Sequence, residues 1–224
     1  MKFIRRTKLY RFLLENEFSF LLFTLALLLI IPSFFFDETR QHLVIHILLS
    51  IVLVAGVNSV IDDRKLRQWG GIIAGISFGL HWIDYFIPPS DFLAIARISF
   101  FLIFFSVITY HTIRLIYNRR IVTLDTLYGA FNGFILIGLI GGFLAMLIET
   151  IFPNSYEIPI NTNTYLDFEL IYFAFVTQTT LGYGDVVPLT TPAQTLSIIL
   201  SITGQIYMTF LVAMLVGKYI RTNQ

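Results

Sequence analysis

The chain has 224 residues, of which 56% are hydrophobic, 16% aromatic and only 13% charged. A soluble domain carries about 25% charged residues, so this composition excludes an ordinary water-soluble fold and favours a membrane protein. The formal net charge is +1 and the chain has no cysteine. Disulfide frameworks, cysteine-ligated zinc sites and thiol chemistry are therefore excluded.

Six apolar segments are long enough to cross a bilayer, which takes about 20 mostly apolar residues in a helix. In chain order they lie near residues 12–36, 42–61, 69–88, 91–117, 126–152 and 192–219. The first follows a basic N-terminal segment, but it is too long for a signal peptide and no small-residue cleavage site follows it. We therefore expect a retained transmembrane helix. Ser90 or Asp91 is expected to cap the fourth helix.

A seventh apolar stretch, from Asp167 to Thr179, has a different length. Its 13 residues would span about 20 Å as a helix, which is too short for a hydrocarbon core of about 30 Å. The stretch must enter the membrane and return on the same side. The sequence therefore predicts an all-α membrane protein with six transmembrane helices and one re-entrant helix followed by a loop.

The basic residues predict the orientation, because Lys and Arg concentrate on the cytoplasmic side of a membrane. Most of them lie in four places that six crossings put on one side: Lys2, Arg5, Arg6, Lys8 and Arg11; Arg64, Lys65 and Arg67; Arg114, Arg119 and Arg120; Lys218 and Arg221. We expect both termini in the cytoplasm and the protein in the plasma (cell inner) membrane. The acids Glu149, Glu157, Asp167, Glu169 and Asp185 then fall outside. There they are either solvated loop residues or a cluster that raises the local cation concentration.

The loop after the short helix carries the most informative motif, Thr177-Gln178-Thr179-Thr180-Leu181-Gly182-Tyr183-Gly184-Asp185. Its Thr-x-Gly-Tyr-Gly-Asp core resembles the selectivity-filter signature of potassium channels. In such a filter, consecutive backbone carbonyls replace the hydration shell of the ion. The carbonyls point the same way only if the backbone alternates between right- and left-handed conformations, which glycine permits at low cost.

The resemblance implies roles for individual residues. It assigns K⁺ coordination to the carbonyls of Thr180, Leu181, Gly182 and Tyr183, together with the Thr180 hydroxyl. It assigns filter support to Tyr172, Thr179, Gly184 and Asp185, and the Tyr172 hydroxyl is expected to bond Asp185. On the last helix, Gly204 matches the hinge glycine of bacterial channels, although a packing glycine is an equal alternative. Met208, Val212 and Val216 are expected to face the cavity or the inner gate.

The same resemblance implies the assembly and the division of the chain. Residues 1–120 would form a four-helix sensor-like or scaffold domain and residues 121–224 the pore domain. Four copies would surround one pore, with K⁺ as the permeant ion and membrane lipids as the environment. No nucleic acid and no small-molecule substrate is expected.

The fourth helix departs from a voltage sensor. Charged residues are needed at every third position, yet the register Arg97, Phe100, Ile103, Ser106, Thr109 is charged only at its first member. We therefore expect weak or absent voltage gating. A lone arginine in lipid needs a partner, with Asp84 the first choice and Asp91 the second. A weak gating charge is the alternative. The four histidines are scattered in sequence, and none is assigned a metal or proton role.

Other functions fit the sequence less well than a potassium channel does. A potassium transporter subunit would be expected to carry several such loops and to lack Tyr183. A non-selective cation channel usually replaces Tyr183 or Gly184. For an enzyme, we find no Gly-x-Ser-x-Gly or His-Glu-x-x-His motif and no acidic metal cluster within a span. A purely structural membrane protein would not need the filter motif. The sequence thus favours a potassium-selective channel subunit that is not an enzyme.

Overall fold

The fold, seen in a computed structural model, is described for residues 17–34, 38–60, 64–86, 90–119, 122–158 and 166–222. Its helices are, in chain order, α2 (Glu17–Ile30), the short 3-10 helix η2 (Ile31–Phe34), α3 (Glu38–Asn58), α4 (Arg64–Phe86), α5 (Asp91–Asn118), α6 (Leu124–Ile151), α7 (Leu166–Gln178) and α8 (Thr191–Thr222). Two short strands, β1 (Tyr156–Glu157) and β2 (Val187–Pro188), pair antiparallel. The basic N-terminal segment, from Lys2 to Arg11, lies outside the described residues.

The prediction of an all-α membrane protein is confirmed in its coarse form. Four helices are long and apolar enough to cross a membrane: α3 from Arg40, then α5, α6 and α8 as far as Lys218. Helix α2 is apolar but has only 14 described residues. Helix α4 has 23 residues and contains four glycines, several basic residues and an aspartate, which lower its mean hydropathy. The count of six crossings therefore stays a prediction.

The starts of helices α5 and α6 have defined caps. The Ser90 hydroxyl oxygen accepts a hydrogen bond from the Leu93 backbone N–H at 3.3 Å, so the prediction of a cap at this point is confirmed for Ser90. Thr123 and Thr126 form a reciprocal capping box at the start of α6. Each cap satisfies N–H groups that the first turn leaves without a helical partner. These caps set where α5 and α6 begin along the chain.

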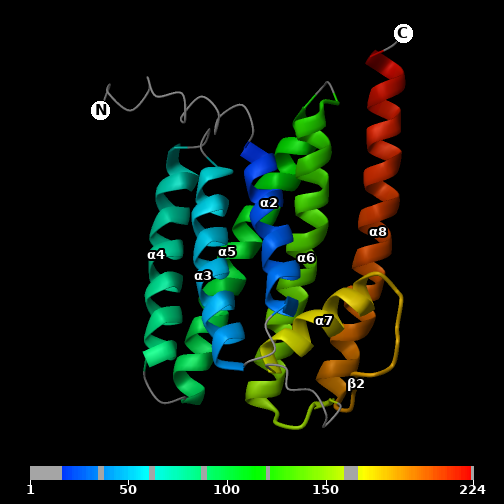
Figure 1. The fold of residues 1–224 in the computed structure, drawn as a ribbon. Helices are drawn as coiled ribbons and strands as arrows, with labels where there is room; N and C mark the ends of the chain where they lie inside the picture. Colours follow the sequence, from blue (N-terminus) through cyan, green and yellow to red (C-terminus); the bar gives the residue numbers. More distant parts are fainter. Residues whose placement is uncertain are drawn as a thin grey trace, which may run out of the picture.

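The central packing lies between α5 and α6. Phe101 and Phe105 of α5 both stack on Phe143 of α6, with ring centroids 5.1 and 5.5 Å apart, and all three rings are buried. Helix α2 also packs on α6, where Asn132 Nδ2 donates to the Phe18 carbonyl at 2.8 Å. Helices α2 and α5 therefore pack on the α6 of their own chain, while α3 packs on α2 and α4 packs on α5 (Figure 1).

Helices α7 and α8 complete the other side of α6. In Figure 1, α7 (yellow) lies across the space between α6 and the lower part of α8, and α8 (orange to red) forms the edge of the molecule. Only 11% of the most apolar stretch of α8 is buried within the chain. An apolar helix with so little protein cover must be covered by lipid or by other protein chains.

Candidate functional site

The segment that follows α7 has an unusual backbone. Thr180, Gly182 and Gly184 have positive φ angles of 58°, 60° and 78°, and the residues between them do not. The left-handed region is expensive for a residue with a Cβ, so Thr180 in particular is held there by its surroundings. When a backbone alternates between left- and right-handed conformations, its successive carbonyl groups point to the same side.

Hydrogen bonds to the last turn of α7 hold the first half of this segment. The Leu181 and Gly182 N–H groups both donate to the Val176 carbonyl, at 3.0 and 3.3 Å. The Thr179 N–H and hydroxyl both donate to the Phe175 carbonyl, at 2.9 and 2.8 Å. The carbonyls at the C-terminal end of α7, which would otherwise lack partners, thus fix the start of the segment.

The other end of the segment is held by a side chain. The Tyr172 hydroxyl donates to Asp185 Oδ2 at 2.6 Å, and the Val186 N–H donates to Asp185 Oδ1 at 3.1 Å. The hydrogen bond from Tyr172 is the main cause that lowers the pKa of the Asp185 carboxyl below its usual value, since it stabilises the ionised form. Asp185 therefore stays charged at neutral pH, at the C-terminal end of the segment.

Within one chain the segment from Thr179 to Asp185 is exposed. Leu181 and Tyr183 are 55% and 67% exposed, and a Cβ placed on Gly182 or Gly184 would meet no atom within 4 Å. The apolar Leu181 side chain and the aromatic Tyr183 side chain are therefore not covered by their own chain.

Gln178 anchors the C-terminal end of α7 between α6 and α8. Its side chain is 1% exposed, and its Nε2 donates to the Phe134 carbonyl of α6 at 2.9 Å. On the other side, Ser201 Oγ of α8 donates to the Thr177 carbonyl at 3.2 Å. A Cβ on Gly204 would collide with the carbonyl oxygen of Gln178. Nothing in the sequence near Gln178 indicates this role, because its partner Phe134 lies far away along the chain.

The remaining residues predicted on α8 lie apart from this anchor. Met208, Val212 and Val216 are 47%, 53% and 52% exposed. Their spacing of four residues places them along one side of the helix. The structure thus leaves this side without cover from its own chain.

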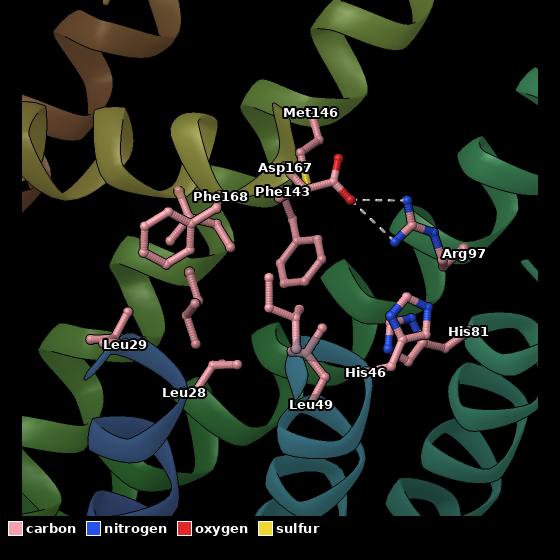
Figure 2. Close-up of a pocket in the computed structure, with 13 residues that line it drawn as sticks. Leu28, Leu29, His46, Leu49, His81, Arg97, Phe143, Met146, Asp167 and Phe168 are labelled. Carbon is pink, nitrogen blue, oxygen red and sulfur yellow. Dashed lines mark hydrogen bonds and ion pairs between the residues drawn. The ribbon is translucent and has the colours of Figure 1, made fainter. Parts of the chain in front are cut away.

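Arg97 lies at the junction of three helices, beside a pocket drawn in Figure 2. It is 6% exposed, and its Nε lies 3.1 Å from Asp84 Oδ2 of α4, although the two groups are not aligned as a hydrogen bond. Its two terminal nitrogens, Nη1 and Nη2, donate to Asp167 Oδ2 of α7 at 3.4 and 3.3 Å. Asp84 was the predicted partner, whereas Asp167 was not selected. Asp91, the second choice, lies exposed in the first turn of α5.

Three of the histidines that are scattered in the sequence come together beside this junction. His46 of α3 and His81 of α4 are stacked with ring centroids 3.8 Å apart. The ring centroid of His42 lies 4.2 Å from that of His46. His46 and His81 are buried and line the same pocket as Arg97. Among the described residues, no group of three or more His, Asp or Glu side chains is arranged to hold a metal ion.

A family described as "Ion channel" matches residues 134–221, which cover most of α6, the short helix α7, the segment with alternating φ and nearly all of α8. A two-pore potassium channel of Arabidopsis thaliana is 40% identical over 63 residues. That match covers 28% of this chain and 22% of the plant protein, so the chain aligns with about a fifth of its relative. No solved structure matches. Residues 134–221 are therefore similar to an ion channel family, and a part of the chain is similar to a potassium channel.

Proposed function

We propose that this chain is one subunit of a potassium-selective channel that lets K⁺ pass down its electrochemical gradient. The carbonyls of Thr180, Leu181, Gly182 and Tyr183, with the Thr180 hydroxyl, would coordinate the ion. The observation that carries the proposal is the alternation of φ from Thr180 to Gly184 on a segment held at both ends. Irregular backbone of this kind is tolerated in a membrane only where it is buried in protein or lines a cavity.

The proposed functional unit is a homotetramer. One chain supplies one strand, whereas replacing a hydration shell takes carbonyls from four strands around an axis. The exposure of Leu181, Tyr183 and most of α8 supports this assembly, since these apolar surfaces need cover. Measuring the mass of the complex in detergent tests it: we expect four copies, and a stable monomer or dimer that conducts K⁺ would contradict it.

Selectivity is tested at Gly182. A side chain there disfavours the left-handed backbone, so Gly182→Ala should lower the preference for K⁺ over Na⁺ without dispersing the tetramer. Tyr183→Ala should act in the same direction. Gly79→Ala of α4 is the matched control, because Gly79 has open space around it and no positive φ. The measurement is the reversal potential under bi-ionic conditions. If Na⁺ and K⁺ pass through the wild-type protein equally well, the protein is a non-selective cation channel.

The proposed topology has six crossings, formed by α2–α6 and α8, with α7 as the re-entrant pore helix. Residues 1–120 form a peripheral four-helix domain and residues 121–224 the pore domain. The start of α2 and the end of α8 lie at the same end of the molecule in Figure 1, which supports two cytoplasmic termini. Because the chain has no cysteine, single cysteines introduced at residues 119 and 153 can be labelled without background. A membrane-impermeant thiol reagent added outside whole cells should label only residue 153.

The proposed channel responds weakly to voltage. Each elementary charge that crosses the whole field is worth ~2.3 kcal/mol per 100 mV, so four copies of Arg97 would supply at most about 9 kcal/mol per 100 mV. Arg97 is buried between two carboxylates, which supports a fixed position and a contribution well below this ceiling. Conductance measured against voltage in reconstituted bilayers tests this point, and a steep curve would contradict it.

A further inference from the structure

Arg97 joins the peripheral helices α2–α5 to α7, the helix that precedes the proposed conducting segment (Thr180 to Gly184). Figure 2 shows the Arg97 side chain extending from α5 toward Asp167, in the first turn of α7. The side chains of Arg97, Asp84 and Asp167 are 7%, 12% and 22% exposed. Ion pairs with so little access to solvent are screened weakly, so they hold their partners in a defined place.

Packing alone leaves room at this end of α7. A cavity of about 20 Å³, enough for one water molecule, lies between α7 and the peripheral helices. It is lined mostly by apolar side chains, among them Leu29, Phe143 and Ile171. The opposite end of α7 is held by Gln178 and Ser201, as described above. The ion pair and hydrogen bonds of Arg97 therefore link the first turn of α7 to α5, beside this cavity.

We propose that Asp167 is a positioning residue for ion selection: through Arg97 it fixes the tilt of α7 and hence the place of Thr180 to Gly184. This inference rests on the proposed function of that segment. Asp84 has a different role at the same arginine, because it belongs to α4 and has no contact with α7 among those described. It compensates the charge of Arg97 and does not position α7.

The charges around Arg97 distinguish the role of Asp167 from that of Asp84. With all three groups ionised, the junction carries one positive and two negative charges. The titratable groups around Arg97 are Asp84 of α4, Asp167 of α7, the stacked His46 and His81 of α3 and α4, and His42 of α3. Removing either carboxylate leaves a neutral pair, whereas removing the arginine leaves two acids buried together. Asp167→Asn and Asp84→Asn should therefore assemble alike, and Arg97→Gln should assemble poorly.

The experiment compares Asp167→Asn with Asp84→Asn in the full-length protein reconstituted in planar bilayers. These variants make the same chemical change at the same arginine, so Asp84→Asn is the matched control. We expect tetramer yields near wild type for both. The ratio of Na⁺ to K⁺ permeability should rise severalfold in Asp167→Asn and stay at the wild-type value in Asp84→Asn. Asp167→Glu keeps the charge but moves the carboxylate outward by one methylene, and should lie between wild type and Asp167→Asn.

The outcomes distinguish this inference from the proposed function. A wild-type protein without K⁺ preference in the same recordings would contradict the proposed function itself. A selective wild type with equal permeability ratios in both aspartate variants would overturn only the role of Asp167. Loss of tetramer in Asp167→Asn but not in Asp84→Asn would also overturn it, since Asp167 would then stabilise the subunit rather than position the filter.

Discussion

Gly204 offers a direct test of how α8 meets the end of α7, just before the segment from Thr180 to Gly184. In the middle of a helix, replacing Gly by Ala ordinarily stabilises by about 1 kcal/mol. At Gly204 the new Cβ would collide with the Gln178 carbonyl oxygen and lie 2.8 and 3.0 Å from the Gln178 Cγ and carbonyl carbon. Two of these three atoms are backbone, so they cannot rotate away. Overpacking of this kind costs about 1–3 kcal/mol, and a net loss of up to about 2 kcal/mol per subunit is expected.

The assay is thermal unfolding of the detergent-solubilised tetramer, followed by recording of single channels. Gly204→Ala should lower the melting temperature and also disturb selectivity, because the C-terminal end of α7 must move. Gly217→Ala in the same helix is the control, since a Cβ there meets no atom of the chain within 4 Å. It should leave the melting temperature unchanged or raise it. If Gly204→Ala instead keeps stability and selectivity but reduces opening, Gly204 acts as a hinge and the packing argument is wrong.

Three further predictions concern other contacts. Arg97→Gln should reduce tetramer yield and leave the slope of conductance against voltage nearly unchanged; a steep wild-type slope that flattens with yield intact would make Arg97 a gating charge. The pKa of Asp185 is lowered chiefly by the hydrogen bond from Tyr172. The stabilisation from the ionised carboxylate is therefore fully present above the pKa of Asp185 in the unfolded chain. It is lost as the pH falls through the lower pKa of Asp185 in the folded protein. Tyr172→Phe should therefore shift the loss of K⁺ current on external acidification to higher pH, and equal titration curves for both proteins would refute the link. Gly138→Ala should lower the melting temperature of the tetramer, because its Cβ would collide with the Phe175 ring; a stability equal to that of the Gly79→Ala control would contradict this packing.

The helices were predictable because their signals are local. The fourth apolar segment, expected over 91–117, forms α5 from Asp91 to Asn118, and the short stretch expected from Asp167 to Thr179 forms α7 from Leu166 to Gln178. Length, apolarity and caps such as Ser90 act within a few residues of one another. The same holds for the segment from Thr180 to Gly184, where Gly182 and Gly184 have the positive φ that glycine favours.

The contacts between helices were not predictable in the same way. Arg97 and Asp167 are 70 residues apart, and nothing in the sequence near Asp167 indicates which helix its carboxylate faces. An acid in the first turn of a helix is common for electrostatic reasons alone, which hides any further partner. Similarly, His46 and His81 lie on two helices whose relative rotation only the packing decides. The role of Gly204 depended on the approach of Gln178, which sequence spacing does not reveal.

The packing of α2 and α5 on α6 within one chain has a consequence for mixed assemblies. In the proposed tetramer, each peripheral domain would act on the quarter of the pore that its own chain supplies. Wild-type and Asp167→Asn chains produced together should then give channels whose permeability changes in steps with the number of mutant copies. Linked dimers of defined composition would make these steps visible as separate populations. Such additive behaviour would make each subunit mechanically autonomous, although all four share one ion pathway.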